Sequence, residues 1–339
     1  MKGLSVGSKN KIFKEGAMDI KPKVSVCIIT YNHEKYIAQC LGSVLNQKVD
    51  FDFEVIVGDD HSTDGTREIL QEFKDNYPDR VKLLLHKNNS GAFLNYSLVH
   101  KAAEGEYIAH MDGDDWMLPG KLQLQSDFLD IHSECSFVTH RVDVVNDNGS
   151  KVLRQHPSGH VAQFKSVNNL VRNYIYFNHS SKMYRCDLRD VEFVAGETKI
   201  DFQFHIENAI TGKIGFLPQT LGCHRKHNES ETAAKGASLR RRIDKTLDAF
   251  ECARTLGVER EDVDYGKSRY LVGAGISCLE CGDSEGLYHY FSLSRVGGKY
   301  ISLSHRIIYG FRRFPKLLML LNNLRKRVVA IKRRYSYIK

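Results

Sequence analysis

The first half of the chain repeats one pattern, in which a short apolar run is followed by a segment with apolar residues at helical spacing. Residues 23–30 (KVSVCIIT) are rich in β-branched residues and end in polar ones, and residues 34–47 follow with the helical pattern. This predicts a buried strand and then a helix. The pair recurs at residues 53–59 with 66–77 and at 81–86 with 92–105, and residues 106–111 add a fourth strand. Such alternation predicts a mostly parallel sheet with right-handed crossovers.

Clusters of polar residues stand where three of these predicted strands end. The carboxyl ends of parallel strands meet at one edge of a sheet, where ligands gather. We therefore expect the three clusters to form one binding site. They are Thr30-Tyr31-Asn32, Asp59-Asp60, and the D-x-D-D run of Asp112, Asp114 and Asp115.

The D-x-D-D run places three carboxylates within four positions, and like charges this close repel unless a positive group or water screens them. Mg²⁺ and Mn²⁺ prefer oxygen ligands and commonly use one or two carboxylates together with substrate phosphates. A bound divalent ion with a phosphate ester would supply the missing positive charge. The alternative is a solvated acidic turn, because Asp and Gly are common in loops. The buried strand before the run and the acidic pair on a neighbouring strand favour the metal site.

The second half of the chain changes in character. Residues 136–155 read as two strands joined by an Asn-Asp-Asn-Gly turn. Residues 180–186 are compatible with a further strand, and residues 198–230 with a helix, a Gly turn and a strand. Beyond about residue 237, the amphipathic stretches 238–257 and 270–295 predict a helical C-terminal region.

Composition and charge limit the classes of protein. With 339 residues and 42% hydrophobic residues the chain can form a substantial core. It has no run near the roughly 20 apolar residues of a membrane-spanning helix, and residues 1–22 read as a loose leader without a signal-peptide core. We expect a cytoplasmic protein, with a possible peripheral place on the inner face of the plasma membrane. Its eight cysteines are scattered, and the single C-x-x-C at Cys278 and Cys281 favours core neighbours on a helix over a metal site.

The positive charge of the chain lies at its C-terminal end. The formal net charge is +8, but residues 304–339 hold 11 Lys/Arg and no Asp/Glu, so the rest of the chain is slightly acidic. This argues against a nucleic-acid-binding core. The segment 304–339 interleaves basic and apolar residues, as a helix lying on an anionic membrane does. A basic helix packed on its own domain is the equal alternative.

Four stretches of the sequence resemble family 2 inverting glycosyltransferases of the GT-A type. The resemblance runs from about Lys23 to Ser230, with the motifs in the order and spacing of the family. It implies an α/β fold with a Rossmann-like sheet flanked by helices, a nucleotide-binding half (about 23–115), an acceptor half (about 116–230) and a helical region over 231–303 before the basic tail. The stretches are VSVCIITYNHEKYIAQCLGSVLNQ, EVIVGDDHSTDGT, NNSGAFLNYSLVHKAAEGEYIAHMDGDD and CHRKH.

The resemblance also implies roles for individual residues in binding the nucleotide-sugar. The first strand end and the following helix start would line the nucleobase and ribose pocket, and one carboxylate of the acidic pair would accept a hydrogen bond from the base; which of the two does so stays open. His61 stands where the family usually has Gly. The implied nucleotide-binding residues are Thr30, Tyr31, Asn32, Glu34, Asp59, Asp60, Asn95, Asp112 and Arg225.

Metal and catalytic residues follow from the same resemblance. Asp114 and His227 are the expected ligands of Mn²⁺ or Mg²⁺, and the metal would stabilise the departing diphosphate. The family takes its catalytic base from an acidic residue 11 positions before a Gly, and Asp201 lies 11 residues before Gly212. Glu197 is the alternative base. The alternative role for Asp201 is structural, as an acidic residue at a helix N-terminus that interacts with the helix dipole.

We therefore expect a metal-dependent inverting glycosyltransferase, a hexosyl- or N-acetylhexosaminyltransferase that uses a UDP-sugar. Its acceptor would be a hydroxyl of a glycan or lipid-linked saccharide in surface polysaccharide biosynthesis, and nucleic acid would not be a partner. A nucleotidyltransferase is one alternative, but the sequence lacks the Gly-rich basic loop expected after its first strand. A non-catalytic glycan-binding protein of the same fold is the other.

Overall fold

The structure, a computed structural model, describes residues 21–188, 199–227, 236–295, 298 and 300–324. Most of the predicted leader (1–22), the alternative base Glu197 and the end of the basic tail from residue 325 lie outside the described residues.

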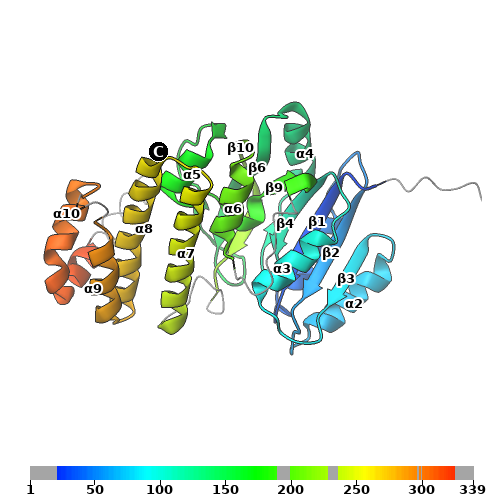
Figure 1. Cartoon of the computed structure of the whole chain (residues 1–339). Helices are drawn as coiled ribbons and strands as arrows, with labels where there is room; N and C mark the ends of the chain where they lie inside the picture. The colour runs from blue at the N-terminus through cyan, green and yellow to red at the C-terminus, as the bar shows by residue number, and fades with distance from the viewer. Residues whose placement is uncertain (1–20, 189–198, 228–235, 296–297, 299, 325–339) are drawn as a thin grey trace, which may run out of the picture.

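One mixed sheet of ten strands runs through the larger part of the described chain (Figure 1). Its main path has the order β3-β2-β1-β4-β9-β6-β10-β5, with β7 paired to β6 and β8 to β10. The strands are β1 (Val24–Thr30), β2 (Phe53–Asp59), β3 (Val81–Leu85), β4 (Tyr107–Asp112), β5 (Trp116–Met117), β6 (Cys135–Val145), β7 (Val152–His156), β8 (Phe164–Lys165), β9 (Met183–Arg185) and β10 (Lys213–Arg225).

The prediction of a parallel sheet is confirmed for the first four strands. β1 pairs in parallel with both β2 and β4, and β2 with β3. The second half of the sheet is mixed instead, since β9 runs antiparallel to both β4 and β6 while β10 runs parallel to β6. The hairpin of β6 and β7, predicted from its turn, is present and antiparallel, as a short connection requires.

Helices cover both faces of the sheet, because successive residues of a strand point to opposite faces. On β1, Val24, Val26 and Ile28 join a core that includes side chains of three helices on one face, whereas Cys27 joins a second core on the other face. The first group of helices is α1 (Ile37–Leu45), α2 (Thr66–Asn76) and α4 (Lys121–Ile131), and the second is α3 (Ala92–Lys101), α5 (Val167–Asn173) and α6 (Asp201–Ala209).

Helix α4 is the one long element of the sheet domain that the apolar pattern does not indicate. Its buried face carries Lys121, Gln125 and Ser126 among the apolar residues, so the helical spacing of apolar side chains is weak. These polar groups are bonded inside the protein: Gln125 Nε2 donates to the carbonyls of Val138 and Ser181. Only the folded chain supplies such partners, so the sequence pattern could not reveal them.

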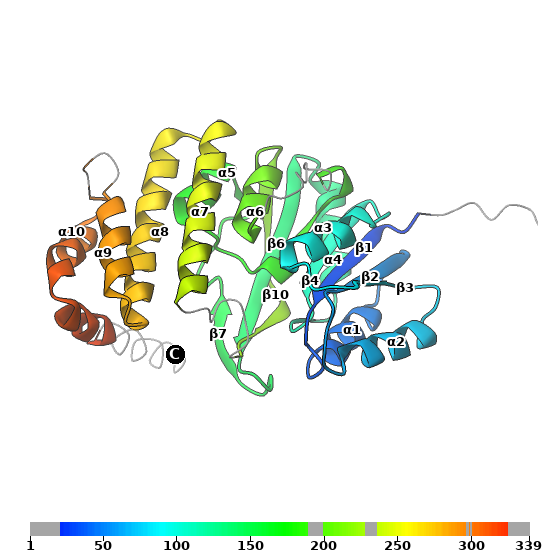
Figure 2. The same cartoon turned by 60° about the horizontal axis from the view of Figure 1, so that its bottom comes forward.

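The C-terminal helices stack against the end of the sheet that is far from β3 (Figures 1 and 2). Helix α7 packs on α6 and α8 packs on α5. The first predicted helical stretch is α7, and the second divides at a Gly-containing turn into the end of α8 and α9. The helices are α7 (Ala237–Thr255), α8 (Arg260–Glu280), α9 (Ser284–Leu293) and α10 (Leu303–Gly310), followed by a 3-10 turn (Phe311–Arg313) and helical residues 315–324.

Two sequence expectations about this region can be compared with the structure. Cys278 is buried in a small apolar core, as expected, but Cys281 is exposed at the end of α8, so the two thiols are not both core neighbours. Within the described ranges, no helix combines the length and the apolar character needed to cross a membrane.

A pair of glycines on α8 provides a test of how this helix docks. A Cβ added at Gly266 would lie 2.1 Å from the backbone carbonyl oxygen of Val171 on α5, whereas a Cβ at Gly273 meets nothing within 4 Å. Gly266→Ala should therefore lower the free energy of unfolding by about 1–3 kcal/mol through overpacking. Gly273→Ala should raise it by up to about 1 kcal/mol, because Ala favours helix more than Gly does. Urea unfolding of both variants measures this, and an equal response would contradict the close approach of α5 and α8.

Candidate active site

The polar strand ends lie side by side at one edge of the sheet, as the sequence predicts. In the strand register Thr30 of β1 stands opposite Asp59 of β2, and Ile29 stands opposite Asp112 of β4. The chain after β4 passes close to β1, since a Cβ added at Gly113 would lie 2.9 Å from the Thr30 side chain. The three clusters therefore share one edge, and the glycine of the D-x-D-D run permits the close approach.

The three carboxylates of that run have different environments. Asp115 is 1% exposed and accepts hydrogen bonds from Ser180 Oγ at 2.6 Å and from the Arg225 backbone N–H at 2.9 Å. Asp114 pairs through Oδ2 with His227 Nε2 at 2.8 Å, and its side chain is 14% exposed. The Asp112 side chain is 32% exposed and contacts Ser180 Oγ at 3.1 Å. Asp115 thus braces the loop, while Asp112 and Asp114 keep part of their surface accessible.

These different environments shift the pKa values of Asp112 and Asp114 in opposite directions. Partial burial, with the charges of Asp115 and Asp114 beside it, raises the pKa of Asp112 above its ordinary value. Burial alone would also raise the pKa of Asp114, but the hydrogen bond from His227 and the nearby His33 and His224 hold that pKa below its ordinary value. Of these two carboxylates, Asp114 is accordingly the one that stays ionised more readily.

The end of β10 supplies positive and hydrogen-bonding groups to the carboxylates. Besides its backbone N–H, Arg225 donates from Nε to the Asp114 carbonyl at 2.9 Å, and its guanidinium lies between the rings of Tyr36 and Trp116 at 4.7 and 4.8 Å. His224 Nδ1 lies 3.2 Å from Asp115. Arg225 is only 2% exposed, so it fixes the acidic loop and the strand end to each other.

Residues of the expected nucleotide pocket surround the ends of β1 and β2. Tyr31 is 43% exposed. Asn32 has a φ of 54°, and its Oδ1 accepts the N–H of Thr63 at 2.8 Å. Glu34 Oε2 accepts the Gly65 N–H at 2.9 Å. His61 has a φ of 67°, a left-handed conformation that glycine adopts more easily. These contacts tie the turn after β2 to the turn after β1.

Both members of the acidic pair bond to protein groups. Asp59 Oδ1 accepts from Arg67 Nε at 2.5 Å. Asp60 accepts the backbone N–H groups of Ser90 and Gly91 at 2.8 Å each, so it holds the loop that leads into α3. Neither carboxylate is more than 3% exposed.

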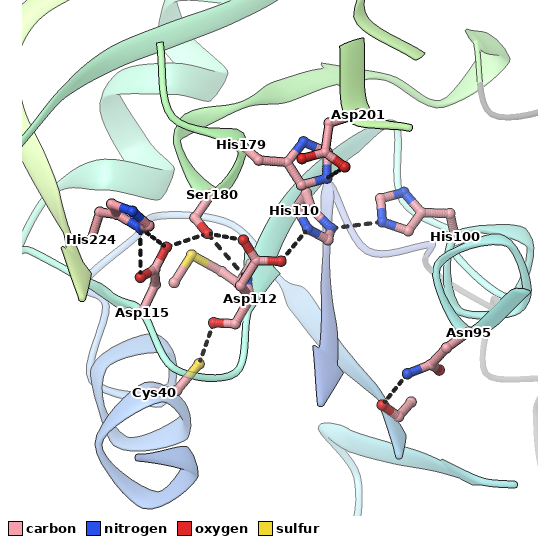
Figure 3. A network of polar contacts seen from close by, with 12 residues as sticks. Cys40, Asn95, His100, His110, Asp112, Asp115, His179, Ser180, Asp201 and His224 are labelled. Carbon is pink, nitrogen blue, oxygen red and sulfur yellow. Dashed lines mark hydrogen bonds and ion pairs between the residues drawn. The ribbon is translucent and has the colours of Figure 1, made fainter. Parts of the chain in front are cut away.

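Asn95 lies behind this edge rather than on its surface. Its Nδ2 donates to the carbonyl of Gly58 at 2.8 Å, and its Oδ1 lies 3.0 Å from His86 Nε2. It is 1% exposed. Figure 3 shows it apart from the carboxylate cluster, where it ties α3 to β2.

Asp201 stands at the first position of α6, with its side chain 59% exposed. Its Oδ1 lies 4.0 Å from Nε2 of His179. The His179 ring packs on His110, with ring centroids 4.0 Å apart, and His110 Nε2 lies 3.2 Å from Asp112 Oδ1. Figure 3 shows this row of side chains running from the acidic cluster to Asp201.

Among the residues of the site that were not singled out from the sequence, three lie close to the acidic loop or to Asp201. Ser180 bridges Asp112 and Asp115, His179 lies beside Asp201, and the buried Lys121 donates from Nζ to the Ser180 carbonyl at 2.6 Å. Burial lowers the pKa of Lys121 to about 7, while Asp115 and Asp112 nearby oppose that shift. Serine, histidine and lysine are common in ordinary loops and helices, so no local signal distinguishes these three.

The acidic loop offers ligands that suit a divalent ion when a substrate supplies the remaining ligands of that ion. Among the residues the structure describes, no group of three or more His, Cys, Asp or Glu side chains is arranged to hold a metal by itself. Asp114 and His227 offer one oxygen and one nitrogen donor at 2.8 Å from each other. Mg²⁺ and Mn²⁺ commonly take one or two protein ligands and complete their shell with phosphate oxygens and water.

Sequence comparison assigns the family. The model of Glycosyl transferase family 2 matches residues 25–191. An uncharacterized protein of Mycobacterium tuberculosis is 35% identical over 205 residues, which cover 60% of this chain and 59% of that protein. TuaG of Bacillus subtilis, named as a teichuronic acid biosynthesis glycosyltransferase, is 38% identical over 117 residues, or 34% of this chain and 45% of TuaG. Residues 25–191 of the chain thus match glycosyltransferase family 2, and the matches to the two relatives span less than two thirds of each of them.

Solved structures show the same fold. Residues 1–349 of TarS from S. aureus, in complex with UDP-GlcNAc, align with a TM-score of 0.62 at 22% identity, over 86% of this chain and 88% of that chain. The mannosyltransferase PcManGT from Pyrobaculum calidifontis, in complex with GDP-Man and Mn²⁺, aligns with a TM-score of 0.55 at 15% identity, over 90% and 88%. The expected GT-A fold is thereby confirmed.

The buried histidines of this region make a prediction about stability and pH. Burial lowers the pKa of five of them below 6.5, that of His179 to about 3. Below about pH 6.5 the unfolded chain binds protons at these positions and the folded chain resists them, so stability falls as the pH falls. Each of these histidines should therefore lower the free energy of unfolding of the protein by about 1 kcal/mol when the pH falls from 7.5 to 5.5. The five are His100, His110, His140, His179 and His205.

Urea unfolding at the two pH values measures the effect. His205→Phe, which fills a site lined by the rings of Phe137 and Phe177, should reduce the loss by about 1 kcal/mol. The same measurement on a variant of the exposed His289, His289→Gln, should leave it unchanged. A stability that does not depend on pH over this range would show that the folded chain accommodates the protonated rings.

Proposed function

We propose that this protein is a metal-dependent inverting glycosyltransferase that moves a sugar from a nucleotide-sugar to a hydroxyl of a saccharide acceptor. The observation that carries the proposal is the pairing of Asp114 with His227 at 2.8 Å, beside the partly exposed Asp112, at the carboxyl edge of the parallel strands. This is where α/β sheets bind nucleotides, and the family match covers the same strands.

The donor would lie along the ends of β1, β2 and β4. The exposed Tyr31 ring offers a face for stacking on the nucleobase, and Asp112 offers a carboxylate to the ribose or to the metal. Thr30, Asn32 and Glu34 shape the pocket through the turns that they hold. Four of the expected nucleotide-binding residues already bond to protein groups, so they would act on the donor mainly by fixing these loops. They are Asp59, Asp60, Asn95 and Arg225. A UDP-sugar is the proposed donor, in line with the UDP-GlcNAc complex of TarS.

Asp114 and His227 would hold Mn²⁺ or Mg²⁺, which when bound neutralises the developing charge on the departing diphosphate. The ionised state of Asp114 suits this role, and the nearby His33 and His224 help to hold its pKa low. The ion would also supply the positive charge that three adjacent carboxylates need.

Asp201 would take the proton from the acceptor hydroxyl. Its exposure at the start of α6 leaves the carboxylate accessible to an acceptor, and the helix N-terminus favours its ionised form. His179, 4.0 Å away, would orient it. With the base and the leaving diphosphate on opposite sides of the anomeric carbon, direct displacement inverts the configuration there.

The acceptor and the organisation of the chain complete the proposal. A growing surface polysaccharide or lipid-linked saccharide is the proposed acceptor, in line with the name of TuaG, and either a hexose or an N-acetylhexosamine is the transferred sugar. Residues 23–230 would form the transferase domain, with the donor half to about 115 and the acceptor half from 116. Residues 231–303 would form a helical region, and the site of action would be the cytoplasmic side of the membrane.

The metal prediction is tested by nucleoside diphosphate release from UDP-, GDP- and dTDP-sugars with Mn²⁺, Mg²⁺ or EDTA. One donor should give slow, metal-dependent release even without acceptor, since water substitutes poorly for the hydroxyl. Asp114→Asn should reduce release at least about 100-fold, because a ligand of the charge-stabilising ion is lost. The control Asp130→Asn changes a carboxylate that pairs with Lys23 outside this site and should keep full release. Release of pyrophosphate from a nucleoside triphosphate incubated with a sugar 1-phosphate would instead indicate a nucleotidyltransferase, and no turnover with any donor would indicate a glycan-binding protein.

The base is tested separately by Asp201→Asn. Turnover should fall at least about 100-fold because general base catalysis is lost, while calorimetric binding of the nucleotide with metal stays within about twofold. An acid that only serves the helix dipole would instead cost about 0.3–1 kcal/mol of stability and leave turnover nearly intact. That second outcome would exclude Asp201 as the base.

A further inference from the structure

The described C-terminal residues after position 302 have two apolar faces, and only one of them is covered. Leu318 is buried, and it packs with Ile308, Tyr309 and Met319 against the α8 and α9 core. A second set of eight large apolar side chains is exposed to solvent, from 37% at Phe311 to 72% at Leu303. They are Leu303, Ile307, Phe311, Phe314, Leu317, Leu320, Leu321 and Leu324.

The spacing of this exposed set places most of its members along one face of α10 and one face of the helical residues 315–324. Leu303 and Ile307 are four residues apart on α10, and Phe311 follows after four more. In helical residues 315–324 the exposed leucines fall at i, i+3, i+4 and i+7, which is one face of a helix. Monomeric soluble proteins rarely expose contiguous apolar surface of this kind unless it binds something. We call these eight residues the outer stripe.

Basic side chains accompany the outer stripe. Arg306, Arg313 and Lys316 are exposed among its residues, and they form no ion pair with any described acidic residue. The sequence continues in the same manner, with 11 Lys/Arg and no Asp/Glu over residues 304–339. In Figures 1 and 2 helix α10 is the outermost element of the helical stack, so the rest of the described molecule leaves this end open.

We propose that the outer stripe and its basic residues dock on the surface of a membrane that contains anionic phospholipids. Apolar side chains flanked by Lys and Arg are the chemistry of a helix lying in the headgroup region, and each basic residue near an anionic surface adds about 1 kcal/mol to binding. A second copy of the chain fits less well, since a symmetric contact would bring two faces of the same positive charge together. Docking here would hold the helical C-terminal end of the described molecule against the bilayer.

This inference does not depend on the proposed enzymatic activity and can be tested without it. The full chain should float with vesicles of phosphatidylcholine that contain about 30% phosphatidylglycerol, and not with phosphatidylcholine alone. Raising the salt to about 0.5 M should weaken flotation, because the Debye length shortens to a few ångström. Donor turnover measured on the same preparation reports on the proposed function independently.

Two variants separate the apolar and the basic contributions. Phe314→Ser/Leu317→Ser/Leu320→Ser removes part of the outer stripe, and Arg306→Gln/Arg313→Gln/Lys316→Gln removes charge. Each should weaken vesicle binding at least about tenfold with an unchanged far-UV circular dichroism spectrum. The matched controls change exposed residues elsewhere and should bind like the original chain. They are Ile131→Ser/Leu153→Ser and Lys48→Gln/Lys87→Gln/Lys101→Gln.

Three outcomes would overturn the inference. The first is no flotation with anionic vesicles by the full chain. The second is flotation that the two variants leave unchanged. The third is concentration-dependent self-association in sedimentation that the stripe variant abolishes, together with no vesicle binding, which would assign the outer stripe to contact between copies of the chain.

Discussion

The site depends on one electrostatic constraint, which is that the negative charges of three adjacent carboxylates must be compensated. Asp112, Asp114 and Asp115 end one strand, and the groups that stabilise two of them come from the end of another strand more than 100 residues later. Arg225 and His227 supply these contacts. Because an uncompensated buried charge is costly, the acidic loop can adopt this arrangement only when the second half of the sheet is in place. The site is thus complete only when both halves of the sheet are folded.

A buried polar layer extends this coupling behind the site. His110 contacts Asp112, and His179 lies between His110 and Asp201, with rings or ring nitrogens 3–4 Å from their neighbours. Burial keeps these imidazoles neutral over the physiological pH range. Neutral rings fill the space between the two halves without adding charge beside the carboxylates. The layer therefore connects the proposed donor side to the proposed acceptor side through direct contacts.

The C-terminal helices are held by apolar packing and close backbone contact rather than by the charged contacts of the site. Helix α8 docks through close backbone approach at Gly266, and the last described residues cover α8 and α9 with one apolar face. Their other apolar face has no partner within the described residues. Catalytic chemistry and the proposed location at a membrane would accordingly reside at separate ends of the molecule, connected by α5 to α8.

The sequence by itself determined the four parallel strands, their helices and the meeting of Thr30, Asp59 and Asp112 at one edge, because strand and helix periodicities are local and parallel strands end together. It also indicated the β6–β7 hairpin and most of the C-terminal helices. Only the tertiary structure decided the antiparallel insertion of β9, the burial of Lys121 on α4, and the places of Ser180 and His179. Those positions depend on hydrogen bonds and charges from distant segments, and such partners leave no pattern in the chain around them.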